Sequence, residues 1–169
     1  RAFDSLSWPF LHQVLRAKGF TTRWITWIEI LLQYASTKVV VNGVPGQKLM
    51  HTCGLGQGDP ISPLLFVIAM DVLTKLVYKA TELGIISSFT GISAIQRLSI
   101  YADDVDMFIR PSSQDLIGVR NLLSAFGEAF GLRINYRKSL AILIRGSEED
   151  RTRVAGMLQC NISEFPCKY

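Results

Sequence analysis

Cysteine is scarce in this sequence, and long hydrophobic runs are absent. The three cysteines, Cys53, Cys160 and Cys167, form no CxxC pair and leave an odd count, so neither a zinc site nor a disulfide framework is indicated. Reduced thiols in an intracellular protein are the simpler interpretation. The longest uncharged apolar stretch, residues 64–70, is far shorter than a bilayer span and is followed by Asp71. No signal peptide is recognisable. We expect a soluble intracellular protein, nuclear or cytoplasmic, with no membrane partner.

A strong charge bias is also missing. Lys and Arg number 18 against 14 Asp and Glu, which gives a net charge of +4. The basic residues form no block; they gather loosely over residues 133–145 and again at Arg151 and Arg153. This mild bias is compatible with a polyanionic partner, but a solvated basic face explains it about as well.

The length and composition indicate one globular domain. The 169 residues, 49% of them apolar and 19% charged, suffice for a single compact core. No repeat, low-complexity segment or linker is present. The sequence starts without an initiator Met and ends in the apolar stretch 165–169. We therefore expect one partial domain over residues 1–169, belonging to a larger protein.

Periodicity and turn residues predict an α+β fold. The expected helices follow cap residues at Ser7, at Thr21 or Thr22, at Ser62, at Ser112 or Ser113, and at Ser147. The expected strands form a hairpin around Asn42-Gly43, a second hairpin at residues 98–109, and a pair at 132–134 and 140–144 around the turn 135–139. Antiparallel hairpins packed by helices on one side favour α+β over a parallel sheet.

The most informative residues are Tyr101-Ala102-Asp103-Asp104. They lie between the apolar runs 98–100 and 105–109, which predicts two strands joined by a tight turn. Asp tolerates turn conformations. However, adjacent carboxylates repel each other, and a purely structural turn would more readily use Asn-Gly or Asp-Gly. Mg²⁺ prefers carboxylate oxygens together with substrate phosphates. From these residues alone, a structural turn and a divalent-metal site are about equally supported.

Five blocks then follow one another along the chain. They are FDSLSW at 3–8, GLGQGDPISPLLF at 54–66, YADD at 101–104, GLRINYRKS at 131–139 and FPCKY at 165–169. In this order they resemble the reverse transcriptases of non-LTR (LINE-type) retrotransposons. Their amino-acid sequences are closest to those of plant elements. The resemblance covers essentially the whole chain. It implies a right-hand polymerase palm with part of the fingers, built as an antiparallel sheet packed by helices.

The resemblance also implies an RNA-directed DNA polymerase that uses two metal ions. Two Mg²⁺ ions would stabilise the attacking primer 3′-oxygen and the leaving pyrophosphate. Asp103 resembles the metal-ligating aspartate of the family, and Asp104 resembles the neighbour that completes the acidic site. Lys138 matches the basic residue that protonates the leaving pyrophosphate, although a plain surface lysine is nearly as well supported. The implied partners are an RNA template, a DNA primer and dNTPs.

Four further positions match nucleotide contacts of the family. Phe3 matches the aromatic that lies under the incoming sugar and excludes a 2′-hydroxyl by its bulk. Gln57 and Gly58 match the loop that contacts the incoming nucleotide and the templating base pair, where glycine permits close backbone approach. A plain flexible loop is the alternative there. Tyr101 would pack under the turn near the primer end, and a strand aromatic with its hydroxyl at the surface is equally supported.

One absence separates this chain from the intact family pattern. The first metal-binding aspartate of the family lies five residues before the aromatic matched by Phe3, a position that precedes Arg1. Asp4 follows that aromatic, so we interpret it as a capping residue. Without the third carboxylate, and without the upstream fingers, the thumb and any endonuclease domain, we expect the isolated chain not to polymerise.

Smaller departures concern Gly56, Phe130 and Asp106. Gly56 replaces a usual polar residue, Phe130 a usual small one, and Asp106 a usual apolar one. If Asp106 faced the core, an unpaired carboxylate there would cost several kcal/mol. Strand alternation places it on the face of Asp104, which favours a tolerated but destabilising change. Such changes are typical of a decaying element copy.

Three functional hypotheses remain open from the sequence. The first is the palm core of a retrotransposon reverse transcriptase. The second is an inactive remnant, or a domesticated palm fragment that only binds nucleic acid. The third is another palm enzyme, such as a group II intron maturase or telomerase, which the blocks at 3–8 and 131–135 fit less well.

Overall fold

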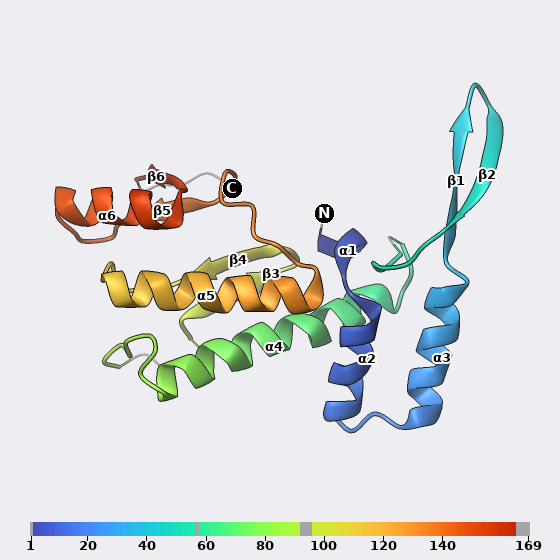
Figure 1. Cartoon of the computed structure of the whole chain (residues 1–169), viewed down its shortest axis with the longest axis horizontal. Helices are drawn as coiled ribbons and strands as arrows, with labels where there is room; N and C mark the ends of the chain where they lie inside the picture. The colour runs from blue at the N-terminus through green and yellow to red at the C-terminus, as the bar shows by residue number, and fades with distance from the viewer. Residues whose placement is uncertain (1, 57, 92–95, 165–169) are drawn as a thin grey trace. The chain divides into compact units, whose positions relative to one another are not determined.

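The computed structural model of the chain describes residues 2–56, 58–91 and 96–164 (Figure 1). The chain divides into two compact units. The first combines residues 1–71 with the short segment 129–132, and the second combines residues 72–128 with 133–169. Two long helices, α4 (Ser62–Glu82) and α5 (Ser113–Phe130), cross the boundaries between these units. None of the described helices is both long enough and apolar enough to cross a membrane.

The first unit begins with three helices. These are α1 (Ala2–Ser5), α2 (Trp8–Ala17) and α3 (Thr22–Gln33). Pro9 lies in the first turn of α2, where its missing N–H leaves no bond unmade. The Thr21 side chain caps α3 by accepting a hydrogen bond from the Trp24 N–H at 3.4 Å. The cap predicted at Thr21 or Thr22 is therefore confirmed, and α2 begins directly after Ser7 as predicted, but the Ser7 side chain makes no capping hydrogen bond.

Backbone contacts between distant segments hold the first unit together. The Ser7 N–H donates to the Phe130 carbonyl at 2.8 Å, and the Gly54 N–H donates to the Leu6 carbonyl at 2.8 Å. The Trp8 indole N–H donates to the Gly54 carbonyl at 2.6 Å. The segments around residues 6, 54 and 130, which lie in three different sequence blocks, consequently form one packed cluster.

Two positions in this cluster require glycine, both because there is no room for a Cβ atom and because the backbone φ is positive. A Cβ at Gly131, whose φ is +76°, would lie 2.3 Å from the Ser5 carbonyl oxygen. A Cβ at Gly54, whose φ is +84°, would lie 2.5 Å from the Asp4 carbonyl oxygen. Any other L-residue would force the backbones apart in addition to adopting a strained left-handed conformation.

The hairpin of β1 (Ser36–Val41) and β2 (Val44–Met50) follows α3. Asn42 and Gly43 both have positive φ, 50° and 81°, as a type I′ turn requires. The predicted Asn42-Gly43 hairpin is therefore confirmed. All of its strand residues are exposed.

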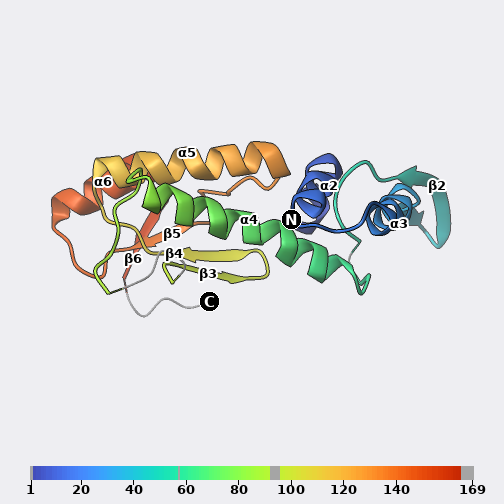
Figure 2. The ribbon, with the colours of Figure 1, turned by 90° about the horizontal axis from the view of Figure 1, so that it is seen from below.

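The second unit contains the remaining elements. These are the end of α4, β3 (Leu98–Tyr101), β4 (Asp104–Met107), most of α5, β5 (Leu140–Ile142), α6 (Glu148–Leu158) and β6 (Asn161–Ser163). α5 runs alongside α4, and the antiparallel β3–β4 hairpin lies on one face of this helix pair (Figures 1 and 2). The α+β class is thus confirmed.

The predicted strand pairing in the last third of the chain is wrong. Residues 132–134 form no strand, and β5 instead pairs in parallel with β6. The reason is the intervening turn: the Ser139 N–H and Oγ both donate to the Asn135 carbonyl, and the Lys138 N–H donates to the same oxygen at 2.9 Å. These bonds wind the chain into one helical turn, which does not reverse it as a hairpin would.

Antiparallel pairing is confirmed for the two hairpins, although the strands of the described residues do not join into one sheet. They form three separate two-stranded sheets, two antiparallel and one parallel.

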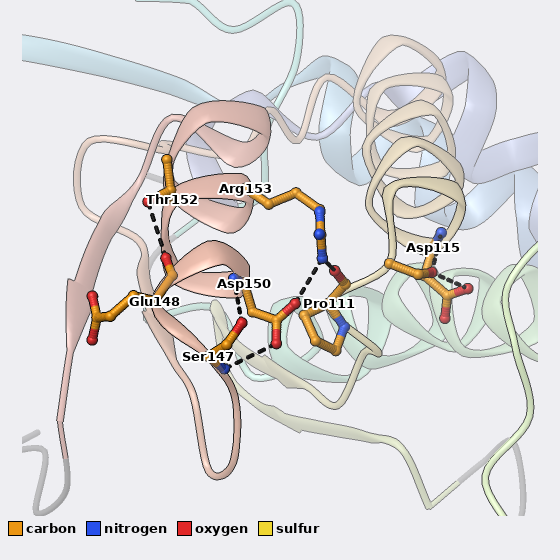
Figure 3. Close-up of polar contacts among 8 residues, drawn as sticks. Pro111, Asp115, Ser147, Glu148, Asp150, Thr152 and Arg153 are labelled. Atoms are coloured by element: carbon orange, nitrogen blue, oxygen red, sulfur yellow. Dashed lines mark hydrogen bonds and ion pairs between the residues drawn. The ribbon is translucent and has the colours of Figure 1, made fainter.

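The start of α6 is fixed by a capping box (Figure 3). Ser147 Oγ accepts from the Asp150 N–H at 3.2 Å, and the Ser147 N–H donates to Asp150 Oδ2 at 3.0 Å. That backbone N–H lowers the pKa of Asp150, as does Arg153 to a smaller extent. Arg153 also donates to the Pro111 carbonyl at 3.0 Å and so ties α6 to the segment before α5. The predicted cap at Ser147 is confirmed.

The close approach at Gly131 gives a direct test of the first unit. We expect Gly131→Ala to lower the free energy of unfolding by at least about 2 kcal/mol more than Gly19→Ala, because a Cβ at Gly131 meets backbone. Gly19 is the matched control: its φ is +84°, and nothing lies within 4 Å of its Cβ position. Urea unfolding followed by circular dichroism measures both. Equal losses would contradict the packing described at residues 5 and 131.

Candidate active site

The turn between β3 and β4 consists of Ala102 and Asp103 alone. Tyr101 and Asp104 form the last strand pair on either side of it. Ala102 has a φ of 51°, whereas Asp103 is not among the positive-φ residues, a pattern of type II′ turns that usually places glycine first. Alanine in the left-handed region costs about 1 kcal/mol. The turn that carries the paired carboxylates is therefore strained, and such strain concentrates at functional sites.

The register divides the hairpin into a polar and an apolar face. Directly opposed residues share a face of a two-stranded sheet. One face of the hairpin therefore carries Tyr101, Asp104, Ser99 and Asp106. Leu98, Ile100, Val105 and Met107 lie on the other side. The residues of the first group are exposed, whereas most of the second group are partly buried. The hairpin thus packs with its apolar face and presents its carboxylates to solvent.

This arrangement bears on two expectations about the hairpin. Asp106 lies on the face of Asp104, as strand alternation predicted, and is exposed, so the cost of a core carboxylate does not arise. Tyr101 is 78% exposed and does not pack under the turn. Its hydroxyl is at the surface, as the alternative interpretation proposed. Its contact with a nucleotide stays a prediction.

The donor set at the turn fits a hard divalent cation. Asp103 and Asp104 are both exposed, and their carboxylate oxygens are ligands that Mg²⁺ prefers. Within residues 2–56, 58–91 and 96–164, no group of three or more metal-ligating side chains lies together. The pair therefore suits an ion that takes its other ligands from phosphates and water, as Mg²⁺ usually does in phosphoryl-transfer sites.

Lys138 lies in the same unit, on the exposed helical turn at residues 135–139. In the described part of the chain it forms no ion pair with Asp103 or Asp104. Its role as a proton donor to pyrophosphate is therefore untested by these contacts and stays a prediction.

Phe3 and Gly58 belong to the first unit. The Phe3 ring stacks on Phe66, with centroids 4.5 Å apart and an interplanar angle of 15°, and the Leu55 N–H donates to the Phe3 carbonyl at 2.7 Å. These contacts join the first block to the second. Gly58 has a φ of +90° with open space at its Cβ position, so conformation, not crowding within the protein, calls for glycine here. Gln57 lies outside the described residues.

The unusual residues Gly56 and Phe130 are both accommodated. Phe130 is fully buried and packs edge-on against Phe10, with ring centroids 4.2 Å apart. A Cβ at Gly56 would meet only ordinary contact, 3.7 Å from the Asp59 Cβ. Neither residue disturbs the packing around it.

A buried polar cluster beneath the hairpin was not predicted from the sequence. Arg97 is 1% exposed and Asp115 is 0% exposed. The available signal was weak: a single Arg immediately before the apolar run 98–100, and a single Asp in the first turn of an expected helix. Long-range contacts, which the sequence does not display, gave these two residues their positions.

Residues 1–162 match the reverse transcriptase (RNA-dependent DNA polymerase) family. Since the match covers nearly the whole sequence, the chain belongs to this family. It follows that the residues around the strained turn belong to a polymerase domain with a palm-like fold. The small antiparallel sheets and covering helices described above are consistent with that fold.

Three relatives show how far the similarity extends. The retrovirus-related Pol polyprotein of the type-2 retrotransposable element R2DM from Drosophila melanogaster is 28% identical over 171 residues, which cover 98% of this chain and 15% of that protein. The Pol polyprotein of a type-1 element R2 from Popillia japonica is 29% identical, over 84% of this chain and 23% of that protein. An uncharacterized mitochondrial protein of Arabidopsis thaliana is 34% identical over 38% of this chain and 55% of that protein. The chain thus spans less than a quarter of each polyprotein.

The strain at Ala102 is open to measurement. We expect Ala102→Gly to raise the free energy of unfolding by up to about 1 kcal/mol, because glycine adopts positive φ without steric conflict. The control is Ala125→Gly on the exposed side of α5, where glycine costs about 1 kcal/mol. Urea unfolding of both variants should give shifts of opposite sign. A loss at position 102 as large as that at 125 would show that the turn is unstrained.

Proposed function

We propose that this chain is the palm core, with part of the fingers, of the RNA-directed DNA polymerase of a non-LTR retrotransposon. The observation that carries the proposal is the exposed Asp103–Asp104 pair on a strained two-residue hairpin turn, in a chain of the reverse transcriptase family. The substrates are dNTPs, added to the 3′-hydroxyl of a DNA primer on an RNA template. We regard residues 1–169 as one partial domain of this polymerase.

Asp103 and Asp104 would hold Mg²⁺ at the tip of the hairpin. When bound, Mg²⁺ supplies charge stabilisation for the attacking and leaving oxygens. The two carboxylates suit this task because they are adjacent and exposed, which leaves the cation open to substrate phosphates. The apolar face of the hairpin packs on the protein, Asp104 lies on the opposite face, and Asp103 is exposed in the turn beside it.

The remaining proposed contacts concern the nucleotide. Phe3, held by its stacking on Phe66, would support the incoming sugar and exclude a 2′-hydroxyl. Gln57 and Gly58 would contact the base pair, Tyr101 the primer end, and Lys138 would donate a proton to the departing pyrophosphate. A net charge of +4 favours the approach of nucleic acid.

We further propose that the chain works inside a longer polypeptide of a plant LINE-type element. The two polyproteins that it resembles are several times longer than the matched region, which supports the first point. The amino-acid sequences of the five blocks and the partial similarity to an Arabidopsis protein support the plant LINE-type origin.

Primer extension by the longer polypeptide tests the assignment. We expect Asp103→Asn and Asp104→Asn each to lower Mg²⁺-dependent DNA synthesis by at least about 10³-fold, since metal stabilisation of the transition state amounts to several kcal/mol. The matched control is Asp106→Asn, which removes the same charge from the same hairpin face and should change the rate by less than about fivefold.

Two results would overturn the proposed function. One is full synthesis by both the Asp103 and the Asp104 variants. The other is a folded parent polypeptide that extends no primer, which would make the chain a retrotransposon remnant that at most binds nucleic acid.

A further inference from the structure

The hairpin that carries Asp103 and Asp104 has little apolar anchorage of its own. None of the residues of β3 and β4 is fully buried: Leu98, Ile100 and Met107 are partly buried, and the others are exposed. Among the described residues, the two strands pair only with each other. An isolated two-stranded ribbon is marginally stable in water. The orientation of this hairpin must therefore be set where it joins the rest of the second unit.

Arg97 closes the base of the hairpin. It directly precedes β3 and is 1% exposed. Its Nε donates to the carbonyl of Phe108, the residue that directly follows β4, at 3.1 Å. The Phe108 N–H donates back to the Arg97 carbonyl at 2.9 Å. Arg97, which lies at one end of the hairpin, thus binds the backbone of the residue at its other end.

The same guanidinium reaches two further segments. Its Nη1 donates to Thr81 Oγ1 in α4 at 3.0 Å and to the Ser87 carbonyl at 2.9 Å. Its Cζ lies 4.9 Å from the centroid of the Phe89 ring, within the range of a cation–π contact. Arg97 therefore connects the base of the hairpin to α4 and to the connection that follows α4.

Asp115 completes the cluster from the first turn of α5. It is 0% exposed, and its carboxylate accepts the Ser87 N–H at 3.1 Å and the Ser87 Oγ–H at 2.8 Å. Ser112 Oγ also donates to it, at 3.2 Å. Burial lowers the pKa of Arg97, and the negative charge of Asp115 opposes this shift. Asp115 thus supports the buried cation electrostatically and fixes Ser87, one of its acceptors.

We propose that Arg97 is a positioning residue for the Asp103–Asp104 pair, which it orients by fixing both ends of the β3–β4 hairpin to α4 and to the Ser87–Asp115 contact. The inference rests on the proposed function, which assigns the two carboxylates to the metal. No side chain of the hairpin is buried enough to replace this polar anchorage.

The geometry makes such a role effective. A strand of four residues is about 13 Å long, so a tilt of about 10° at the base displaces the tip by about 2 Å. Catalytic groups must be held within about 0.5 Å of their working positions. A loss of orientation at Arg97 is therefore large enough to disable the carboxylates without unfolding the domain.

The test uses a pair of changes that keeps the buried charge balanced. Arg97→Met alone would leave the Asp115 carboxylate buried without its cation and risk unfolding. Arg97→Met combined with Asp115→Asn removes both charges, and the asparagine still offers an oxygen to Ser87. The matched controls are Val154→Ala in α6 and Val119→Ala in α5, two buried sites of the same unit outside the cluster.

Two readouts on the longer polypeptide separate positioning from stability. Hydrogen exchange should become at least about tenfold faster over residues 98–108 in the folded double variant, but not in the controls. Mn²⁺ affinity, measured by electron paramagnetic resonance of the free ion, should fall about 10- to 100-fold, as for other residues that orient metal ligands. In primer extension, kcat should fall while KM for the template–primer stays unchanged.

The outcomes distinguish this inference from the function on which it rests. A folded double variant with parental exchange at 98–108 and parental Mn²⁺ affinity overturns the role of Arg97. If Asp103→Asn retains parental Mn²⁺ affinity, the metal assignment fails, and the role of Arg97 in positioning metal ligands fails with it. In that case, faster exchange would show only a structural anchor.

Discussion

The close approach of two glycine backbones to the segment at residues 4–7 is the constraint on which the first unit depends. Gly54 and Gly131 each occupy positions where a Cβ would overlap a carbonyl oxygen of that segment. Because they can lie so close, the Gly54 and Ser7 amides complete their hydrogen bonds to Leu6 and Phe130. The Trp8 indole, which donates to the Gly54 carbonyl, and the Phe130 ring, which packs on Phe10, are both buried in this unit. The first, second and fourth sequence blocks are consequently packing partners, in addition to whatever they contribute to catalysis.

In the second unit, the β3–β4 hairpin exposes two adjacent carboxylates to solvent, so it cannot be buried from both sides. A turn with adjacent negative charges and alanine at positive φ lowers the stability of the hairpin. The apolar face of the strands offsets part of this cost, and the Arg97 cluster supplies the remaining attachment. Buried polar groups that are hydrogen-bonded on several sides define a single orientation better than apolar contacts do. This is a physical reason to find an arginine where an aliphatic residue would pack more simply.

Local signals in the sequence predicted the elements that local chemistry controls. Thr21 and Ser147 accept backbone hydrogen bonds at helix starts, and Asn42-Gly43 forms the turn that its φ preferences favour. The strand predicted at 132–134 failed because the following residues satisfied their amides within a helical turn. Strand alternation placed Asp106 on the face of Asp104, and the register confirms this, but which face of the hairpin is solvated depends on the element packed against it.

By itself, the sequence determined the family of this protein and the residues of its candidate site. The order of the five blocks identifies the family, since each block is a short, continuous stretch of sequence that can be recognised without knowledge of the fold. Only the tertiary structure decided which face of the hairpin is solvated, that β5 pairs with β6, and that Arg97, Thr81, Ser87 and Asp115 meet in one cluster. The contacts within the cluster and between β5 and β6 join residues 10 to 28 positions apart, and their partners were chosen by the packing of helices and strands. No local pattern records that choice.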